Sequence, residues 1–129
     1  MGNIGLLGNA IINRVKELIP ELQALPDDER VEVINQIKLA MHDISPLRDE
    51  PVDCVLWVDA DTVQANNYNP NTVAPPEMRL LELSIAEDGF TQPIVTWAVD
   101  GHREVVDGFH RNRVGKESKK VHCLIWTDS

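Results

Sequence analysis

The feature that most constrains this chain is a change of hydrophobic period near residue 45. Before it, apolar residues recur every three or four positions, as in NAIINRVKELIPELQAL, which indicates amphipathic helices. After it, short apolar runs such as CVLWV, QPIVTWAV and VHCLIW alternate with turn-forming residues, which is typical of strands. A chain of 129 residues that is 43% hydrophobic can bury a core. The pattern predicts a helical hairpin over 1–50 followed by an α/β domain with a mixed sheet over 51–129.

Two prolines set the limits of the helices in the first part. Pro20 interrupts the first periodic segment, so the first helix is expected to kink or end there. Pro26 and two aspartates form a start signal for a second helix. Its apolar side chains share one face, which we interpret as core or a packing seam, although such a helix pair can also hold a protein partner. These residues are Val31, Ile34, Ile37, Met41 and Ile44.

The second part reads as an alternation of strands and helices. DADTVQANNYNPNTVAPP is expected to be a long loop, and PEMRLLELSIAEDG a helix with Pro76 near its start and Gly89 at its end. The tripeptide DGH predicts a hairpin between QPIVTWAV and REVVDG. FHRNRVGKESKK is then expected to form a helix, and VHCLIW a last strand.

Charge and composition exclude several classes of function. The net charge of −9 opposes contact with a phosphate backbone, so direct DNA binding is expected to be weak or indirect. However, residues 101–120 carry six basic and three acidic residues. This local excess suits one small anion, or it is an ordinary solvated helix face. The absence of a long apolar run or signal peptide predicts a cytoplasmic protein without membrane contact.

The spacing of the two cysteines and four histidines does not indicate a metal site or a catalytic group. Cys54 and Cys123 lie in apolar stretches and are interpreted as small buried hydrophobes, with one disulfide left open. The histidines are scattered, so no metal site is assigned. Asp107 and His110 could still share a complex of Mg²⁺ with a nucleotide.

The segment VVDGFHRNR is the strongest candidate for a binding site. A strand runs into Gly108, which permits close approach of the backbone to a ligand. The first amides of a following helix have no partners within the helix and attract phosphate. Arg111 and Arg113 add permanent charge, and His110 can donate a hydrogen bond to a phosphate oxygen.

The segments GFTQPIVTW and EVVDGFHRNRVGKE resemble the ParB/sulfiredoxin superfamily over about residues 54–126. Within it, the segments EPVDCVLWV, YNPNTVAPPEM and EVVDGFHR resemble those of the IbrB-type co-activators of prophage gene expression. The resemblance implies a ParB/sulfiredoxin-like fold that binds a nucleotide, such as a nucleoside triphosphate with Mg²⁺. It also implies the residues that would contact the nucleotide or its phosphates. The predicted site is therefore Gly108, His110, Arg111, Ser84, Gln92 and Arg113.

Three departures from that superfamily bear on activity. Phe109 stands where sulfiredoxins carry the nucleophilic cysteine, and a phenyl ring cannot form a thiolate. The loop NNYNPN has amides where the related serine kinases have a catalytic carboxylate. The helix-turn-helix domain that follows in ParB is not expected here, and a truncated C-terminal region is left open. These departures favour a regulatory module, and no catalytic residue is assigned. The likeness to IbrB-type proteins implies a transcriptional co-activator or regulator of phage or prophage origin. The alternative is a small enzyme that hydrolyses nucleotides or nucleic acid or transfers a phosphoryl group.

Overall fold

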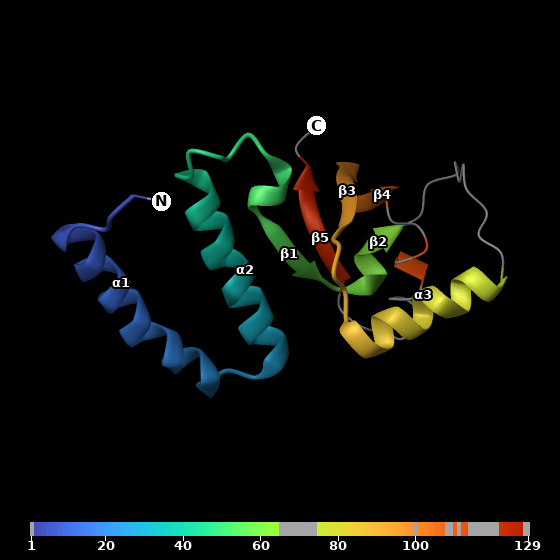
Figure 1. The fold of residues 1–129 in the computed structure, drawn as a ribbon, viewed down its shortest axis with the longest axis horizontal. Coiled ribbons are helices and arrows are strands. Elements are labelled where there is room, and N and C mark those ends of the chain that lie inside the picture. The colour runs from blue at the N-terminus through green and yellow to red at the C-terminus, as the bar shows by residue number, and fades with distance from the viewer. Residues whose placement is uncertain are drawn as a thin grey trace. The chain divides into compact units, whose positions relative to one another are not determined.

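The computed structural model describes residues 2–64, 75–99, 101–107, 110, 112–113 and 122–127. Of residues 75, 99, 107 and 122–127 it describes the backbone alone. The chain divides into two compact units, Met1–Ile34 and Asn35–Ser129 (Figure 1). This division rests on contacts alone and does not test the predicted boundary between two functional domains after residue 50, which stays a prediction.

The first unit consists of α1 over Leu6–Leu18, a 3-10 helix over Ile19–Ala24, and the beginning of α2 over Asp27–Asp43. The α-helical geometry ends just before Pro20, because proline has no N–H to donate to the preceding turn. The prediction that the first helix ends or kinks at this proline is therefore confirmed. The first turn of α2 carries three acidic residues, which interact favourably with the positive end of its dipole.

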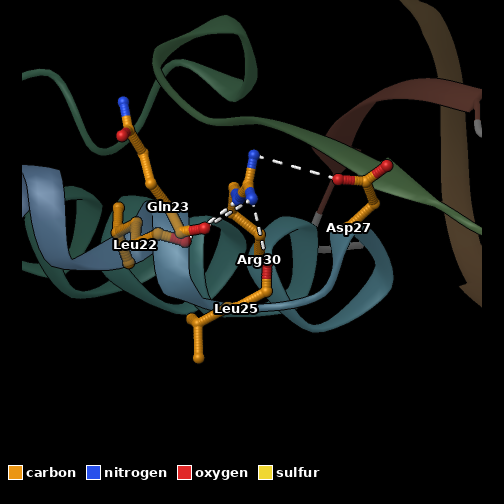
Figure 2. A network of polar contacts seen from close by, with 5 residues as sticks. All are labelled: Leu22, Gln23, Leu25, Asp27 and Arg30. Atoms are coloured by element: carbon orange, nitrogen blue, oxygen red, sulfur yellow. Dashed lines mark hydrogen bonds and ion pairs between the residues drawn. The ribbon is translucent and has the colours of Figure 1, made fainter.

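Arg30 holds the joint between the two helices (Figure 2). Its Nε donates to the carbonyl oxygen of Leu22 at 3.0 Å, and its Nη2 donates to those of Gln23 and Leu25 at 3.1 and 2.9 Å. Asp27 lies 3.8 Å from Nη1. The Leu22 carbonyl oxygen also accepts from the Leu25 N–H at 3.1 Å, so the guanidinium adds a second donor there and reaches two further carbonyls at the joint.

The second unit is built on a five-stranded sheet in the order β1-β5-β3-β4-β2. β3 and β4 form an antiparallel hairpin that turns at Gly101, whose φ of +85° is in the left-handed region that favours glycine. β5 pairs antiparallel with β1 and parallel with β3, so the sheet is mixed as predicted. The strands are β1 Val55–Val58, β2 Val63–Gln64, β3 Ile94–Val99, β4 His102–Asp107 and β5 His122–Thr127.

Two groups of buried side chains form the core of this unit. Val63, Ile94 and Val105 come from β2, β3 and β4 and are fully buried. Met78 and Ile85 are buried on α3, which spans Pro75–Asp88. Leu81 and Phe90 pack against the second group. The predicted helix with its stop at Gly89 is confirmed, since Gly89 has a φ of +75° directly after α3.

The second half of α2 covers the free edge of β1 with polar side chains. Asn35 is buried; its Nδ2 donates to the carbonyl oxygen of Trp57 at 2.5 Å, and its Oδ1 accepts from the Trp57 N–H at 3.1 Å. Lys38 Nζ donates to the carbonyl oxygen of Val55 at 3.2 Å. An edge strand presents unpaired backbone groups, and here the helix supplies their partners.

The interpretation of the apolar stripe of α2 as core is wrong for its second half. Ile37, Met41 and Ile44 are 44%, 58% and 81% exposed. The buried residue of this helix is Asn35, which lies on a different face. The helix turns its polar face to the strand edge because the backbone groups there need hydrogen-bond partners, and the apolar stripe is left outward.

The long loop predicted over residues 59–76 contains regular structure in its first part. A 3-10 turn spans Ala60–Thr62, with the Asp59 side chain accepting from the Asp61 N–H at 3.0 Å. β2 follows directly and pairs parallel with β4. A two-residue strand is too short to show a period of two, so it could not be predicted from the hydrophobic pattern. Residues 65–74 lie outside the described part.

Candidate functional site

The predicted turn follows directly on a strand that the core holds in place. β4 ends at Asp107, and Val105 of this strand is fully buried. His110, Asn112 and Arg113 have helical geometry. The end of the expected strand and residues of the expected helix start are thus described, whereas the turn between them stays a prediction. Gly108 and Arg111 lie outside the described residues, as does the rest of the helix predicted over residues 114–120.

His110 is the predicted site residue with the most informative environment. Its Nε2 atom is buried and has no hydrogen-bond partner among the described residues. A buried polar atom costs free energy unless it is hydrogen-bonded, so such an atom in a native structure calls for an explanation. A ligand group beside His110 would supply the missing bond. Asn112 is buried at 3% exposure, whereas Arg113 is exposed.

Sheet register places Gln92 near the same end of the β3–β4 hairpin as His110. Val95 of β3 pairs with Asp107 of β4. Gln92 lies three residues before Val95, and His110 lies three residues after Asp107. Because the strands are antiparallel, the entry to one and the exit of the other meet at one end of the hairpin. Gln92 is exposed at a bend there, free to contact a ligand.

Ser84 and Arg103 are less closely tied to this turn. Ser84 is exposed on α3, next to the buried Ile85, and no contact among the described residues joins it to His110. Arg103 belongs to the basic stretch but pairs with Ala98 and Val63 at the far end of β4. Burial lowers the pKa of its guanidinium. The basic residues of 101–120 therefore do not all gather at the turn.

A second group of interacting polar side chains, which the sequence did not indicate, lies in the second unit. The His42 Nδ1 lies 2.7 Å from Asp53 Oδ2, and both line a pocket of about 410 Å³ beside β1. The hydrogen bond with His42 is the main cause that lowers the pKa of the Asp53 carboxyl, and Ser45 contributes in the same direction. Eleven positions separate the pair along the chain. No short sequence motif indicates this pair, because His42 lies in α2 and Asp53 lies in the 3-10 turn before β1.

Cys54 lines the same pocket and is a buried, free cysteine. Burial raises the pKa of its thiol, so it behaves as a small hydrophobe there, as predicted. Within the described residues, no group of three or more histidine, cysteine and acidic side chains is placed to hold a metal ion. Nor does any helix described have the length and apolar character needed to span a bilayer.

In sequence comparison, no protein-family model matches the chain. It is 50% identical over 117 residues to the uncharacterized protein YbdM of Escherichia coli strain K12. The match covers 89% of this chain and 56% of YbdM. The chain therefore spans little more than half the length of this curated relative.

Two solved structures share the fold. One is the C-terminally truncated chromosome-partitioning protein ParB from Caulobacter crescentus complexed with CTP-γ-S, with 22% identity and a TM-score of 0.53. This match covers 58% of the present chain and 44% of ParB. The other is sulfiredoxin from Arabidopsis thaliana, with 16% identity, a TM-score of 0.51, and coverage of 58% and 85%. The predicted ParB/sulfiredoxin-like fold is confirmed, and the finer likeness to IbrB-type co-activators stays a prediction.

Proposed function

We propose that this protein is a ParB-like regulatory module that binds a nucleotide at the turn Gly108–Phe109–His110–Arg111. The observation that carries the proposal is the buried Nε2 of His110, which has no partner among the described residues. It lies just beyond a strand fixed in the core, where the following helix start favours an anion. The fold supports the same idea, since the similar ParB structure is complexed with CTP-γ-S.

The proposed contacts divide between the turn and its neighbours. Gly108 gives the phosphate close access to the backbone, and Arg111 provides a forked pair of donors. His110 donates through its ring, and Gln92 contacts the ligand from the entry to β3. Ser84 and Arg113 are proposed to lie at the edge of the nucleotide site, farther from the phosphate than the turn. The ligand is a nucleoside triphosphate, carried with Mg²⁺.

We infer regulation rather than turnover from the side chains that the turn carries. Phe109 cannot act as a nucleophile, and the amide-rich loop NNYNPN offers no carboxylate as a base. A protein partner would bind the apolar residues of α1, several of which are exposed. The output of the module is proposed to be control of transcription through that partner, with direct DNA contact weak or indirect.

The experiment starts from a thermal-shift panel of CTP, GTP, ATP and UTP, each with and without Mg²⁺. A nucleotide that binds only the folded state raises the melting temperature, because the stabilisation grows with the logarithm of the ratio of nucleotide concentration to Kd. Calorimetric titration of the nucleotide with the largest shift then compares wild type with Arg111→Ala. The loss of hydrogen bonds to a charged group is expected to cost about 1.5–3 kcal/mol, which is about a tenfold to hundredfold weaker affinity.

Two control variants locate the effect within the turn. Arg113→Ala removes the same charge from an exposed position and is expected to matter less. Phe109→Cys is expected to leave binding nearly intact, because the phenyl ring offers no charge to a phosphate. Equal affinity of Arg111→Ala and wild type for the nucleotide would refute the proposal that this turn is the binding site. Steady release of phosphate or nucleoside monophosphate by the wild type would favour the enzymatic alternative.

A further inference from the structure

The pocket beside β1 is separate from the proposed nucleotide site. It is formed by the second half of α2, the 3-10 turn over Pro51–Asp53 and the start of β1, all within the second unit. β1 lies at one edge of the sheet, and β5 and β3 stand between it and β4. Its volume of about 410 Å³ falls in the range of small-molecule sites.

One wall of the pocket is polar and held in a fixed arrangement. His42 and Asp53 contact each other through Nδ1 and Oδ2 at 2.7 Å, with side chains 16% and 20% exposed. Ser45 lines the same pocket and contributes, after His42, to the lowered pKa of the Asp53 carboxyl. The contact between His42 and Asp53 leaves Nε2 as the imidazole nitrogen that can meet a ligand. The Asp53 carboxylate already faces His42, so it does not serve as the main contact for a cation.

Lys38 supplies a positive charge whose partner is a neutral group. Its Nζ donates to the carbonyl oxygen of Val55, and no ion pair with a carboxylate is found for it among the described residues. An ammonium group has three donors, so two remain for a ligand. The hydrogen bond to Val55 also fixes the position of the ammonium group at the pocket wall.

The remaining wall is apolar and chemically inert. Met41 and Val52 are large apolar residues with 58% and 65% exposure. Cys54 is buried with a raised thiol pKa, which keeps it protonated and unsuited to attack a substrate. The pocket therefore combines one fixed ammonium group with an apolar surface, and its chemistry is that of noncovalent binding.

We propose that this pocket binds a small organic monocarboxylate, with Lys38 contacting its carboxylate and Met41 and Val52 covering its apolar part. A single ammonium group matches a single negative charge. Asp43 and Asp53 act electrostatically on the same region, and they weigh against a multiply charged anion such as phosphate. This inference goes beyond the nucleotide proposal and does not depend on it.

Benzoate is a suitable probe, because methionine sulfur makes favourable contacts with aromatic rings. The full chain labelled with ¹⁵N is titrated with benzoate, with its neutral analogue benzamide, and with inorganic phosphate. Saturable shifts of the backbone amides around His42 and Val55 are expected with benzoate. Benzamide and phosphate are expected to give at least about tenfold weaker binding, the loss typical of a charge-assisted hydrogen bond.

Two matched variants test the location of the site. Met41→Glu places a carboxylate on the pocket wall and is expected to weaken benzoate binding by at least about tenfold. Ile44→Glu adds the same charge at an 81% exposed position outside the pocket lining, and it is expected to bind like wild type. Neither variant touches a buried residue, so both are expected to fold.

Four results would overturn the proposal. The first three are the absence of saturable benzoate shifts around the pocket, equal binding of benzamide and benzoate, and equal losses in Met41→Glu and Ile44→Glu. The fourth is phosphate binding as tight as benzoate binding, which would indicate a simple anion site. Each result is independent of whether a nucleotide binds at the turn over residues 108–111.

Discussion

The two units of the chain use opposite means of stabilisation. Within Met1–Ile34, no described side chain is buried, and apolar residues of α1 such as Leu6 and Leu7 are 93% and 76% exposed. Within Asn35–Ser129, four side chains of the described residues are fully buried, which are those of Val63, Ile94, Thr96 and Val105. The first unit depends on local helix formation and the hydrogen bonds of Arg30, whereas the second depends on a packed core. An amphipathic period therefore predicts a helix but does not by itself predict burial.

The contrast continues inside α2, which belongs to both units. Its buried residue is an asparagine, and its exposed residues include isoleucine and methionine. The strand edge accounts for this inversion. Satisfying the backbone groups of Trp57 requires a side chain with both a donor and an acceptor, which Asn35 provides and an apolar residue cannot.

The largest expected effect comes from the same substitution made once in each unit. Ile94→Ala removes a fully buried side chain and is expected to lower the free energy of unfolding by about 2–5 kcal/mol. Ile11→Ala changes a residue of α1 that is 50% exposed, and the expected change is within about 0.5 kcal/mol. Urea unfolding followed by circular dichroism measures both. Similar losses in the two variants would show that α1 is packed as firmly as the sheet.

The next effect concerns the helix that covers the strand edge. Asn35→Ala leaves the N–H and carbonyl of Trp57 without their side-chain partners, and the expected loss of stability is about 1–3 kcal/mol. Exchange of the Trp57 amide hydrogen should accelerate as well. Asn13→Ala, at an exposed position of α1, is the control and is expected to change little. An unchanged exchange rate at Trp57 would contradict the role assigned to Asn35.

A smaller and more local effect is expected at Arg30. Arg30→Met removes the donors to Leu22, Gln23 and Leu25, and we expect a local loss of about 1–2 kcal/mol because the contacts are partly exposed. Hydrogen exchange in the first unit should rise while the sheet stays protected. Arg14→Met removes the same charge from an exposed site on α1 and serves as control. Loss of protection in β3 and β4 would mean that the joint supports the whole chain.

The smallest effect is a dependence on pH. The pKa of Asp53 in the folded protein lies below its ordinary value, so folding favours the charged carboxylate. Its contribution is present above the ordinary pKa of about 3.9 and is lost as the pH falls through the lowered value. Asp53→Asn is expected to reduce the acid sensitivity of unfolding below about pH 4. Asp49→Asn, at a neighbouring exposed position, is the comparison, and identical acid profiles would refute the assignment.

Most elements of the fold could be predicted because their signals are local. The ends of α3 and the β3–β4 hairpin follow from Pro76, Gly89 and Gly101, whose backbone preferences act within a few residues. The candidate turn was also predicted, since a strand leading into DGFHR is visible in the sequence. His110 of this turn is described, and its buried Nε2 has no partner among the described residues, whereas the role of Arg111 stays a prediction.

The sequence by itself thus determined α1, α2, α3 and four of the five strands in the described residues, and the resemblance implied how they are arranged. The turn after β4 lies outside the described residues and stays a prediction. Only the tertiary structure decided that Asn35 is buried, that β2 pairs with β4, and that His42 meets Asp53. The physical reason is range. Helix periods and turn preferences act between close neighbours, whereas partners for a strand edge or a pocket wall come from segments that the folded sheet brings together.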